Sequence, residues 1–383
     1  MGTPRKVVFM IPTMSGGGSE KVMLEILQHL DRTAFDPYLV VFQKKGAFLD
    51  RLPPLVPVHS LVDRYYFFCR WVIYFRYKKF ISILRPDVVV SFMWYPNFIV
   101  LLERWFSRGK QKVIISERNT LAFTNKGGLT GNIRKLIVQL LYPTADYVIA
   151  LTRQMKRELL ETSPIELHKI KVIHNPVDIY GLERSSKEPI DVTCFDPSLP
   201  LILSIGSLTR QKGFKYLISA FAHVIEECPA HLVILGEGKD RRRLQSLIEH
   251  LGIREWVHLP GFEKNPYKYM AHATTFALSS IYEGFPNALI EAMALGVPCI
   301  ATRCPTGPEE IITDGVDGLL VSPAEENSLA ETITRMLQDV ELQKRLSEAG
   351  KKRVKDFRVE KIVRQYQDLI MTVMNPRMMS EEG

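Results

Sequence analysis

Short apolar runs alternate with longer segments of helical periodicity from one end of the chain to the other. The apolar runs are continuous rather than interleaved with polar residues, which is typical of parallel strands covered on both faces. They predict strands at residues 6–12, 38–43, 87–93, 112–118, 147–152, 201–207, 231–238, 257–262, 274–280 and 298–302. Helical patterns between them include residues 20–30, 152–161, 214–227, 239–251 and 286–295. This alternation predicts an α/β protein of doubly wound, Rossmann-like domains.

The chain has 383 residues, more than one ordinary compact domain holds, so two domains are expected. A polar, turn-rich stretch at residues 175–200 separates them. We place an N-terminal domain at residues 1–179 and a C-terminal domain at residues 180–355. Residues 356–383 contain a last helix with no strand after it, and its pattern allows it to pack on either domain.

Composition narrows the cellular setting. No apolar run approaches the roughly 20 residues that cross a bilayer, and neither a transmembrane helix nor a cleavable signal peptide is expected. The five cysteines are scattered without metal-like spacing, which favours a reduced, cytoplasmic protein. A net charge of +8 favours anionic partners. The basic residues form no nucleic-acid recognition motif, so no nucleic-acid partner is expected.

Two glycine loops join a strand to a helix at matching places in the two halves. The first, with Gly17 and Gly18, would let backbone N–H groups approach an anion at a helix N-terminus. The second contains Arg210 and Lys212, and two cations at the end of a strand suit a diphosphate. Each loop also has an ordinary explanation, as a simple turn or a solvated basic loop. The matching positions favour a binding function.

The stretch "EGFPNALIEA" places two carboxylates, Glu283 and Glu291, around the start of a helix. Pro286 suits the first helical turn, so the N–H groups of Asn287 and Ala288 could receive an anion. Carboxylates accept hydrogen bonds from sugar or ribose hydroxyls. The alternative is a capped core helix, in which Glu283 complements the helix dipole and Glu291 is exposed.

In their order along the chain, these motifs resemble glycosyltransferase family 4, the retaining GT-B enzymes that use nucleotide-sugar donors. The resemblance rests on "GGGSE", "HNPVD", "GSLTRQKGF", "LGEG", "LPGF", "EGFPNALIEAMALGVPCIAT" and "EEIITDGVDGLLVSP". It covers nearly the whole chain and is more specific in the second half. It implies two facing Rossmann-like domains with the donor in the cleft, the N-terminal one binding the acceptor and the C-terminal one the nucleotide sugar. It also implies a C-terminal helix that crosses back to the first domain. It also implies a hexosyltransferase that retains anomeric configuration.

The resemblance implies catalytic roles for Glu283, Lys212 and Arg210. Glu283 would hold hydroxyls of the donor sugar and would not act as a nucleophile, while Lys212 would stabilise the leaving diphosphate. Glu291 would bind the ribose hydroxyls. The other positions implied in donor binding are Gly17, Gly18, Gly206, Ser207, Phe262, Gly284, Phe285, Pro286, Asn287, Ala288 and Leu289.

The chain departs from the family pattern at two places. Many members carry arginine where this chain has Ser207, and Arg210 is the candidate to reach the same phosphate. Many members carry a histidine after a first-domain strand, where this chain has Glu117, Arg118 and Asn119 as candidates. The "SERN" sequence there is similar to the bacterial branch that extends lipid-linked or surface glycans. No DxD motif is required, so we expect no metal and no other cofactor.

Residues 64–85 hold six basic residues, nine aromatic residues and no acidic residue. This composition suits a membrane interface or a polyprenyl-diphosphate acceptor. The alternative is a core helix whose arginines reach the surface along their apolar stems. We predict peripheral contact with the inner face of the membrane through residues 64–85.

These expectations combine into one function and two alternatives. The predicted enzyme transfers a sugar from a nucleotide diphosphate, with UDP-N-acetylhexosamine such as UDP-GalNAc as first candidate, to a lipid-linked or surface glycan. GDP-mannose or another hexose donor stays open. The alternatives are a GT-B-fold UDP-sugar epimerase and a non-catalytic protein that binds nucleotide or membrane.

Overall fold

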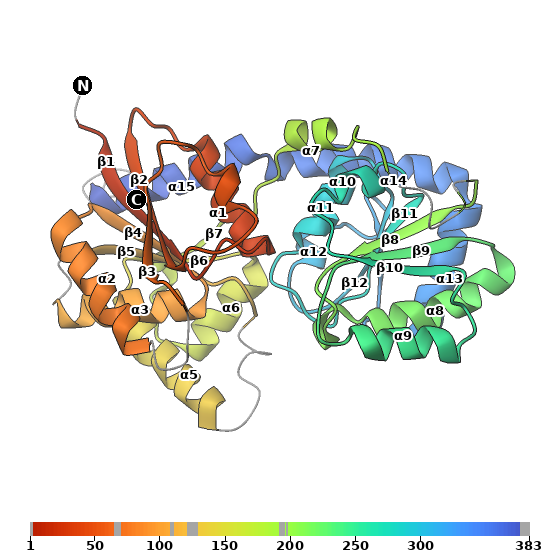
Figure 1. The fold of residues 1–383 in the computed structure, drawn as a ribbon, viewed down its shortest axis with the longest axis horizontal. Coiled ribbons are helices and arrows are strands. Elements are labelled where there is room, and N and C mark those ends of the chain that lie inside the picture. Colours follow the sequence, from red (N-terminus) through yellow and green to blue (C-terminus); the bar gives the residue numbers. More distant parts are fainter. Residues whose placement is uncertain are drawn as a thin grey trace. The chain divides into compact units, whose positions relative to one another are not determined.

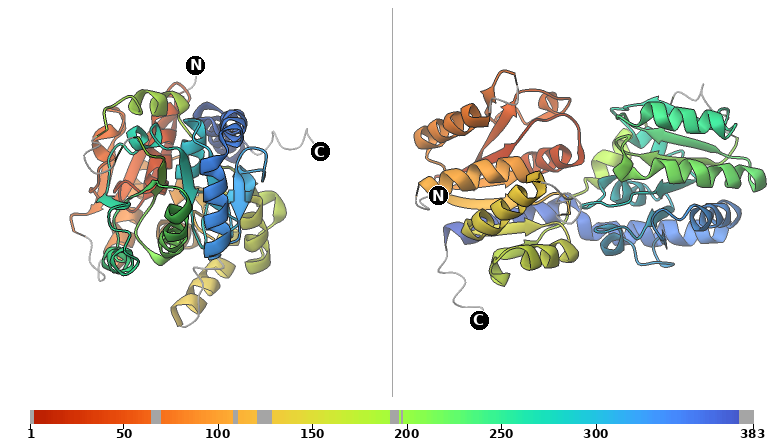
Figure 2. Two further views of the ribbon diagram at one scale, coloured as in Figure 1. Left: turned by 90° about the vertical axis from the view of Figure 1, so that its right-hand side faces the viewer. Right: turned by 90° about the horizontal axis from the view of Figure 1, so that it is seen from below.

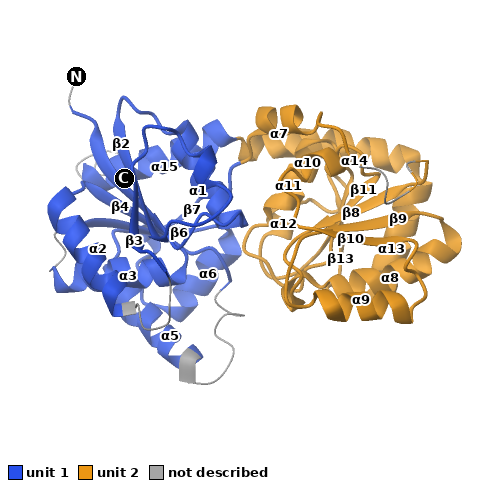
Figure 3. Cartoon of the chain, viewed as in Figure 1, with its two compact units in different colours: residues 1–176, 359–383 blue, residues 177–358 orange. Residues whose placement is uncertain are grey.

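The computed structural model describes residues 3–64, 70–107, 111–120, 129–190, 196 and 198–375. The chain forms two compact units (Figure 3): unit 1 comprises residues 1–176 and 359–383, and unit 2 comprises residues 177–358. Both boundaries lie three residues from the positions expected from sequence, 179/180 and 355/356. Val177 and Arg358, the first and last residues of unit 2, pair in a parallel bridge.

Unit 1 is built on a seven-stranded sheet of order β3-β2-β1-β4-β5-β6-β7 (Figure 1). Every neighbouring pair of strands is parallel. The strands are β1 (Arg5–Ile11), β2 (Phe35–Gln43), β3 (Val58–Val62), β4 (Val88–Phe92), β5 (Lys112–Ser116), β6 (Tyr147–Ala150) and β7 (Ile170–Val172). All five residues of β4 are buried, which explains why four of them are apolar, Ser91 being the exception.

Helices cover both faces of this sheet. They are α1 (Gly18–His29), α2 (Arg70–Leu84), α3 (Trp94–Phe106), α5 (Leu129–Leu141), α6 (Arg153–Thr162) and α15 (Val359–Met374). Helices α1 and α15 lie on one face, and α2, α3, α5 and α6 lie on the other (Figure 1). The last helix of the chain therefore belongs to unit 1, where Ile362, Tyr366 and Ile370 share one core with α1. Their spacing places all three on one side of the helix.

Unit 2 has a six-stranded parallel sheet of order β10-β9-β8-β11-β12-β13. Its strands are β8 (Leu201–Ile205), β9 (His231–Leu235), β10 (Val257–Gly261), β11 (Thr275–Leu278), β12 (Cys299–Thr302) and β13 (Leu319–Val321). Its helices are α7 (Ile179–Ser185), α8 (Phe214–Glu227), α9 (Arg241–His250), α10 (Tyr267–Met270), α11 (Asn287–Ala294), α12 (Pro308–Ile311), α13 (Glu326–Gln338) and α14 (Val340–Arg353).

The strand order of each unit reverses direction once. In unit 2 the reversal falls between β8 and β11, and in unit 1 between β1 and β4. In open α/β sheets, ligands bind at the carboxyl ends of strands beside such a reversal. The loops after β8 and β11 are therefore where a binding site in unit 2 is expected. Among the described residues, no helix has the length and apolar character to span a membrane.

Candidate active site

The loops after β8 and β11 bring Lys212 and Glu283 together in unit 2. Lys212 ends a single turn of 3-10 helix, Arg210–Lys212, and its Nζ lies 2.6 Å from Oε1 of Glu283. Ser280 donates a second hydrogen bond of 2.6 Å to the same oxygen. Glu283 is 5% exposed and Ser280 is fully buried. Among the described residues, both side-chain hydrogen bonds to the Glu283 carboxylate end on Oε1, which holds the carboxylate in one orientation.

The backbone around Glu283 is held by the segment that follows β12. The Glu283 N–H donates to the carbonyl of Pro305 at 2.8 Å. The hydroxyl of Thr306 donates to the carbonyls of Glu283 and Gly284, at 2.7 and 3.0 Å. Thr306 is itself buried. Sequence reasoning did not identify Ser280 or Thr306, because neither residue type is distinctive until the fold places it beside a carboxylate.

Two glycines allow the lysine loop to approach this site. A Cβ on Gly206 would lie 2.9 Å from Cε of Lys212. Gly213 has φ +63°, and a Cβ there would lie 2.0 Å from the carbonyl oxygen of Ser279. A side chain at position 206 would displace the Lys212 side chain, and one at position 213 would displace the loop that carries it. The glycine spacing seen in the sequence thus has a structural cause within unit 2.

Helix α11 starts directly behind Glu283. Pro286 is its N-cap residue and supplies no side-chain cap. The N-terminus of a helix carries positive potential. Glu291, in the second turn, is 6% exposed. The alternative in which Glu291 is a solvated helix residue is therefore wrong. Phe285 and Leu289 are buried, and Phe285 packs edge-on against Phe357 with ring centroids 5.4 Å apart.

The remaining candidates of unit 2 lie at the surface or provide backbone. Arg210, Ser207 and Phe262 are exposed, Phe262 at 55%. Their side chains are accessible to a ligand. The roles expected for them, and for Asn287 and Ala288 through their amides, stay predictions.

In unit 1, the first glycine loop leads into α1. Gly17 is the N-cap residue and Gly18 the first residue of the helix, with no side-chain cap, and both are exposed. A Cβ on Gly17 would lie 2.6 Å from Oε2 of Glu20. The nearest neighbour of this position is the Glu20 side chain, which can rotate away, so the role of Gly17 in closing on a ligand stays a prediction.

Of the "SERN" residues after β5, the structure exposes only the side chain of Asn119. Glu117 is 1% exposed and accepts a hydrogen bond of 2.6 Å from the hydroxyl of Tyr142. Burial raises the pKa of the Glu117 carboxyl above its usual value. Arg118 is 4% exposed and donates to Oδ1 of Asn175 at 2.6 Å. Of the three candidates, Asn119 is therefore the one with a solvent-exposed side chain within unit 1.

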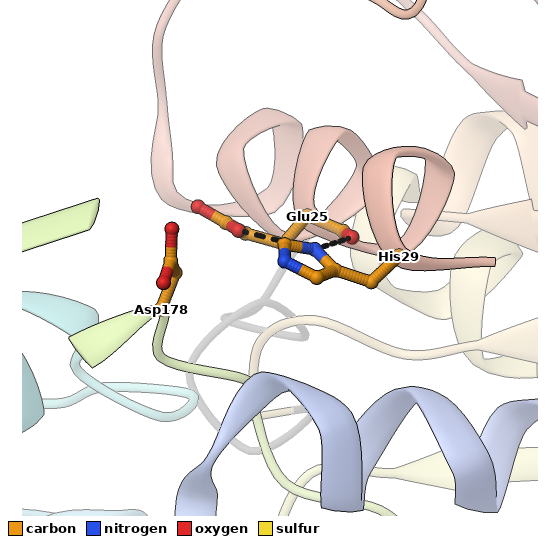
Figure 4. A group of neighbouring side chains, drawn as sticks. All are labelled: Glu25, His29 and Asp178. Atoms are coloured by element: carbon orange, nitrogen blue, oxygen red, sulfur yellow. Dashed lines mark hydrogen bonds and ion pairs between the residues drawn. The ribbon is translucent and has the colours of Figure 1, made fainter. Parts of the chain in front are cut away.

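Figure 4 draws three side chains of metal-ligating type, Glu25, His29 and Asp178. Glu25 and His29 lie one turn apart on α1, and Nδ1 of His29 is 2.9 Å from the carbonyl oxygen of Glu25. Asp178 is the N-cap residue of α7 in unit 2 and accepts a hydrogen bond of 3.0 Å from the N–H of Gly181. His29 and Asp178 therefore each have a hydrogen bond within their own unit, and metal-independent activity stays a prediction.

Comparisons with known proteins agree with this architecture. Residues 16–180 match the family "Glycosyltransferase Family 4", and residues 189–353 match "Glycosyl transferases group 1". An uncharacterised glycosyltransferase of Methanocaldococcus jannaschii is 34% identical over 334 residues, covering 77% of this chain and 82% of that protein.

A second relative, from Campylobacter jejuni, is the N-acetylgalactosamine-N,N'-diacetylbacillosaminyl-diphospho-undecaprenol 4-alpha-N-acetylgalactosaminyltransferase. It is 31% identical over 367 residues, which cover 94% of this chain and 98% of the relative. The crystal structure of Anabaena HepE in complex with UDP and glucose superposes with a TM-score of 0.81 at 18% identity, covering 96% of this chain and all of that one. This likeness establishes the fold, and the near-complete match to the Campylobacter relative establishes the family. The chain belongs to glycosyltransferase family 4 and is a glycosyltransferase of GT-B fold.

Proposed function

We propose that this enzyme transfers an N-acetylhexosamine, with UDP-GalNAc as the first candidate donor, to a lipid-linked glycan with retention of configuration. The observation that carries the proposal is the Lys212–Glu283–Ser280 arrangement at the strand reversal of unit 2, next to the N-terminus of α11. The Campylobacter relative supports the choice of sugar and acceptor, because its name specifies N-acetylgalactosaminyl transfer to an undecaprenyl-diphosphate glycan.

The proposed chemistry needs no nucleophilic side chain. The bond from the sugar C1 to the donor phosphate breaks, and the acceptor hydroxyl oxygen forms a new bond to C1 on the same face. The acceptor proton passes to the departing phosphate. Lys212 and the start of α11 stabilise the negative charge that develops on this leaving group. Oε2 of Glu283 accepts a hydrogen bond from a sugar hydroxyl, and Glu291 holds the ribose.

The lipid-linked acceptor places the enzyme at the cytoplasmic face of the membrane. Residues 64–85 are the segment that we expect to make this contact. The structure describes residue 64 and residues 70–85, and residues 65–69 lie outside the described part of the chain. In the described part, Trp71 and Phe75 are 67% and 62% exposed, and Lys78 and Lys79 are also exposed. Exposed rings beside cations favour membrane contact over a wholly buried core helix.

The donor is tested by thermal unfolding with a panel of UDP- and GDP-sugars, because a ligand that binds the native state raises its stability. UDP-GalNAc is expected to give the largest shift, and transfer to a polyprenyl-diphosphate glycan is followed by release of UDP. No product with any donor would overturn the proposal. UDP-sugar conversion without an acceptor would instead support the epimerase.

Two variants separate the roles of the carboxylates. Glu283→Gln should lower kcat by orders of magnitude with little change in donor affinity, because the sugar contact is lost at the reacting centre. Glu291→Ala should chiefly raise the KM for the donor. Small and equal losses in both variants would contradict these assignments.

A further inference from the structure

Three consecutive helices of unit 1, α2, α3 and α5, expose an unusual share of large apolar side chains. Nine of the sixteen exposed large hydrophobic residues among the described residues lie on these helices, although the helices have only 15, 13 and 13 residues. The nine are Trp71, Val72, Phe75, Ile83, Trp105, Phe106, Ile133, Leu136 and Leu140. Exposed apolar residues scattered singly are normal, but a concentration on neighbouring helices marks an interaction surface. We call these nine residues the three-helix face.

The three helices lie side by side on one face of the unit 1 sheet, as the view from below in Figure 2 shows. Tyr74 joins the aromatic part of the surface. Its buried ring contacts the exposed rings of Trp71 and Phe75 on α2 and Phe106 on α3, with centroids 6.4, 5.3 and 6.3 Å apart. The exposed rings therefore form one patch that spans two helices.

On α5 the exposed apolar residues follow helical spacing. Ile133, Leu136 and Leu140 are 48%, 53% and 56% exposed, and their spacing of three and four residues places them in one stripe. This stripe faces away from Val138, which is fully buried against the sheet. The helix thus has one apolar side in the core and a second one at the surface.

The exposed charged side chains on α2, α3 and α5 themselves have one sign. The sequences of α2, α3 and α5 contain a single carboxylate, Glu103, and it is only 6% exposed. Exposed cations are present on the same helices, namely Lys78 and Lys79 on α2 and Lys135 on α5. Apolar and aromatic side chains beside lysines, without exposed acids, complement an anionic bilayer, where rings enter the interface and cations meet lipid phosphates.

We infer that the three-helix face binds the surface of an anionic bilayer. The contact includes the α5 stripe and the end of α3, which sequence composition did not single out, as well as the exposed side of α2. The inference rests on the proposed function only for the biological role of this contact, which is to hold unit 1 at the membrane where a lipid-linked acceptor is found. Vesicle binding itself requires neither donor nor acceptor.

The test is co-sedimentation of the full chain with phosphatidylcholine vesicles, with and without phosphatidylglycerol. Binding is expected with the anionic vesicles and should weaken with salt. Lys78→Gln combined with Lys79→Gln should reduce affinity about 25-fold, since each base near an anionic surface contributes about fivefold. Leu136→Ser combined with Leu140→Ser should reduce it about tenfold or more.

Val316→Ser combined with Val340→Ser is the matched control, since these exposed valines of unit 2 lie outside the three-helix face. The control should bind vesicles like the parent chain. The thermal shift induced by the donor should persist in every variant, which would show that the variants are folded. A loss of vesicle binding can then be told apart from a failure of the donor assignment.

Equal binding by all variants, or equal binding to neutral and anionic vesicles, would overturn the inference. A change in oligomeric state of the Leu136 and Leu140 variant without loss of vesicle binding would also overturn it, and would assign the stripe to contact between two copies of the chain.

Discussion

Removing the hydroxyl of Ser280 should slow catalysis while leaving donor binding nearly intact. Ser280 is fully buried and donates a 2.6 Å hydrogen bond to Oε1 of Glu283, the oxygen that Lys212 also contacts. In Ser280→Ala, one of the two donors that hold the carboxylate is lost. The Glu283 side chain then has more freedom to rotate about its remaining contact with Lys212.

The size of the effect follows from the kind of bond removed. A hydrogen bond to a charged group contributes about 1.5–3 kcal/mol. If this bond serves to orient Glu283 in the transition state, kcat should fall by about 10- to 150-fold at 1.4 kcal/mol per factor of ten. The KM for the donor should change less than threefold, because the expected diphosphate and ribose contacts are unaffected.

Ser204→Ala is the matched control for steady-state measurement of UDP release. Ser204 is also buried and also makes a 2.6 Å hydrogen bond, but to the carbonyl oxygen of Ala277 within the same sheet. Both variants should lose similar stability, and only Ser280→Ala should lose kcat. Equal kcat losses in the two variants would refute the reasoning, and so would a Ser280→Ala enzyme within twofold of the parent.

Two further predictions concern unit 2. Gly213→Ala should lower the free energy of unfolding by more than about 2 kcal/mol, because φ is +63° and the new Cβ would meet the carbonyl oxygen of Ser279. Gly252→Ala, at φ +69° with nothing within 4 Å, should cost about 1 kcal/mol in urea denaturation, and equal costs would contradict the steric argument. Burial lowers the pKa of His258 to about 4. As pH falls from about 6.5 to 4, this histidine therefore binds a proton in the unfolded chain while it stays neutral in the folded chain. The free energy of unfolding should therefore be about 1 kcal/mol lower at pH 5 than above pH 6.5, as measured by Trp256 fluorescence. The variant His258→Gln should show a smaller decrease, and an unchanged decrease would contradict the assignment.

The central strands of both sheets could be predicted from sequence, whereas three edge strands could not. The missed strands are β3, β7 and β13, each of which lies at the edge of its sheet. Edge strands have a neighbouring strand on one side only, so they can contain fewer apolar residues than central strands. β7 and β13 have only three residues each, and β3 includes His59 and Ser60. Periodicity detects burial, and these strands are too short or too polar to carry that signal.

The candidate site shows the same limit at the level of single residues. The motif around Glu283 was recognisable because a proline, a helix start and a carboxylate are close in sequence. Lys212 was expected at the diphosphate, but its contact with Glu283 was not, because the two residues lie 71 positions apart. Thr306, which binds the Glu283 carbonyl from 23 positions away, was not identified at all. The burial of Arg118 was equally hidden, since it depends on Asn175, 57 positions later. Such contacts are properties of the folded sheet and not of any local pattern.

The bridge between Val177 and Arg358 has an evolutionary consequence. The chain enters and leaves unit 2 at neighbouring points, with the Val177 N–H 2.8 Å from the carbonyl oxygen of Phe357. A segment whose two ends are adjacent can be exchanged between relatives by recombination at two sites without rerouting the rest of the chain. Replacing residues 177–358 would substitute the whole Lys212–Glu283 site while α15 stays in the core of unit 1. The fold thus permits the Lys212–Glu283 site to be inherited separately from unit 1.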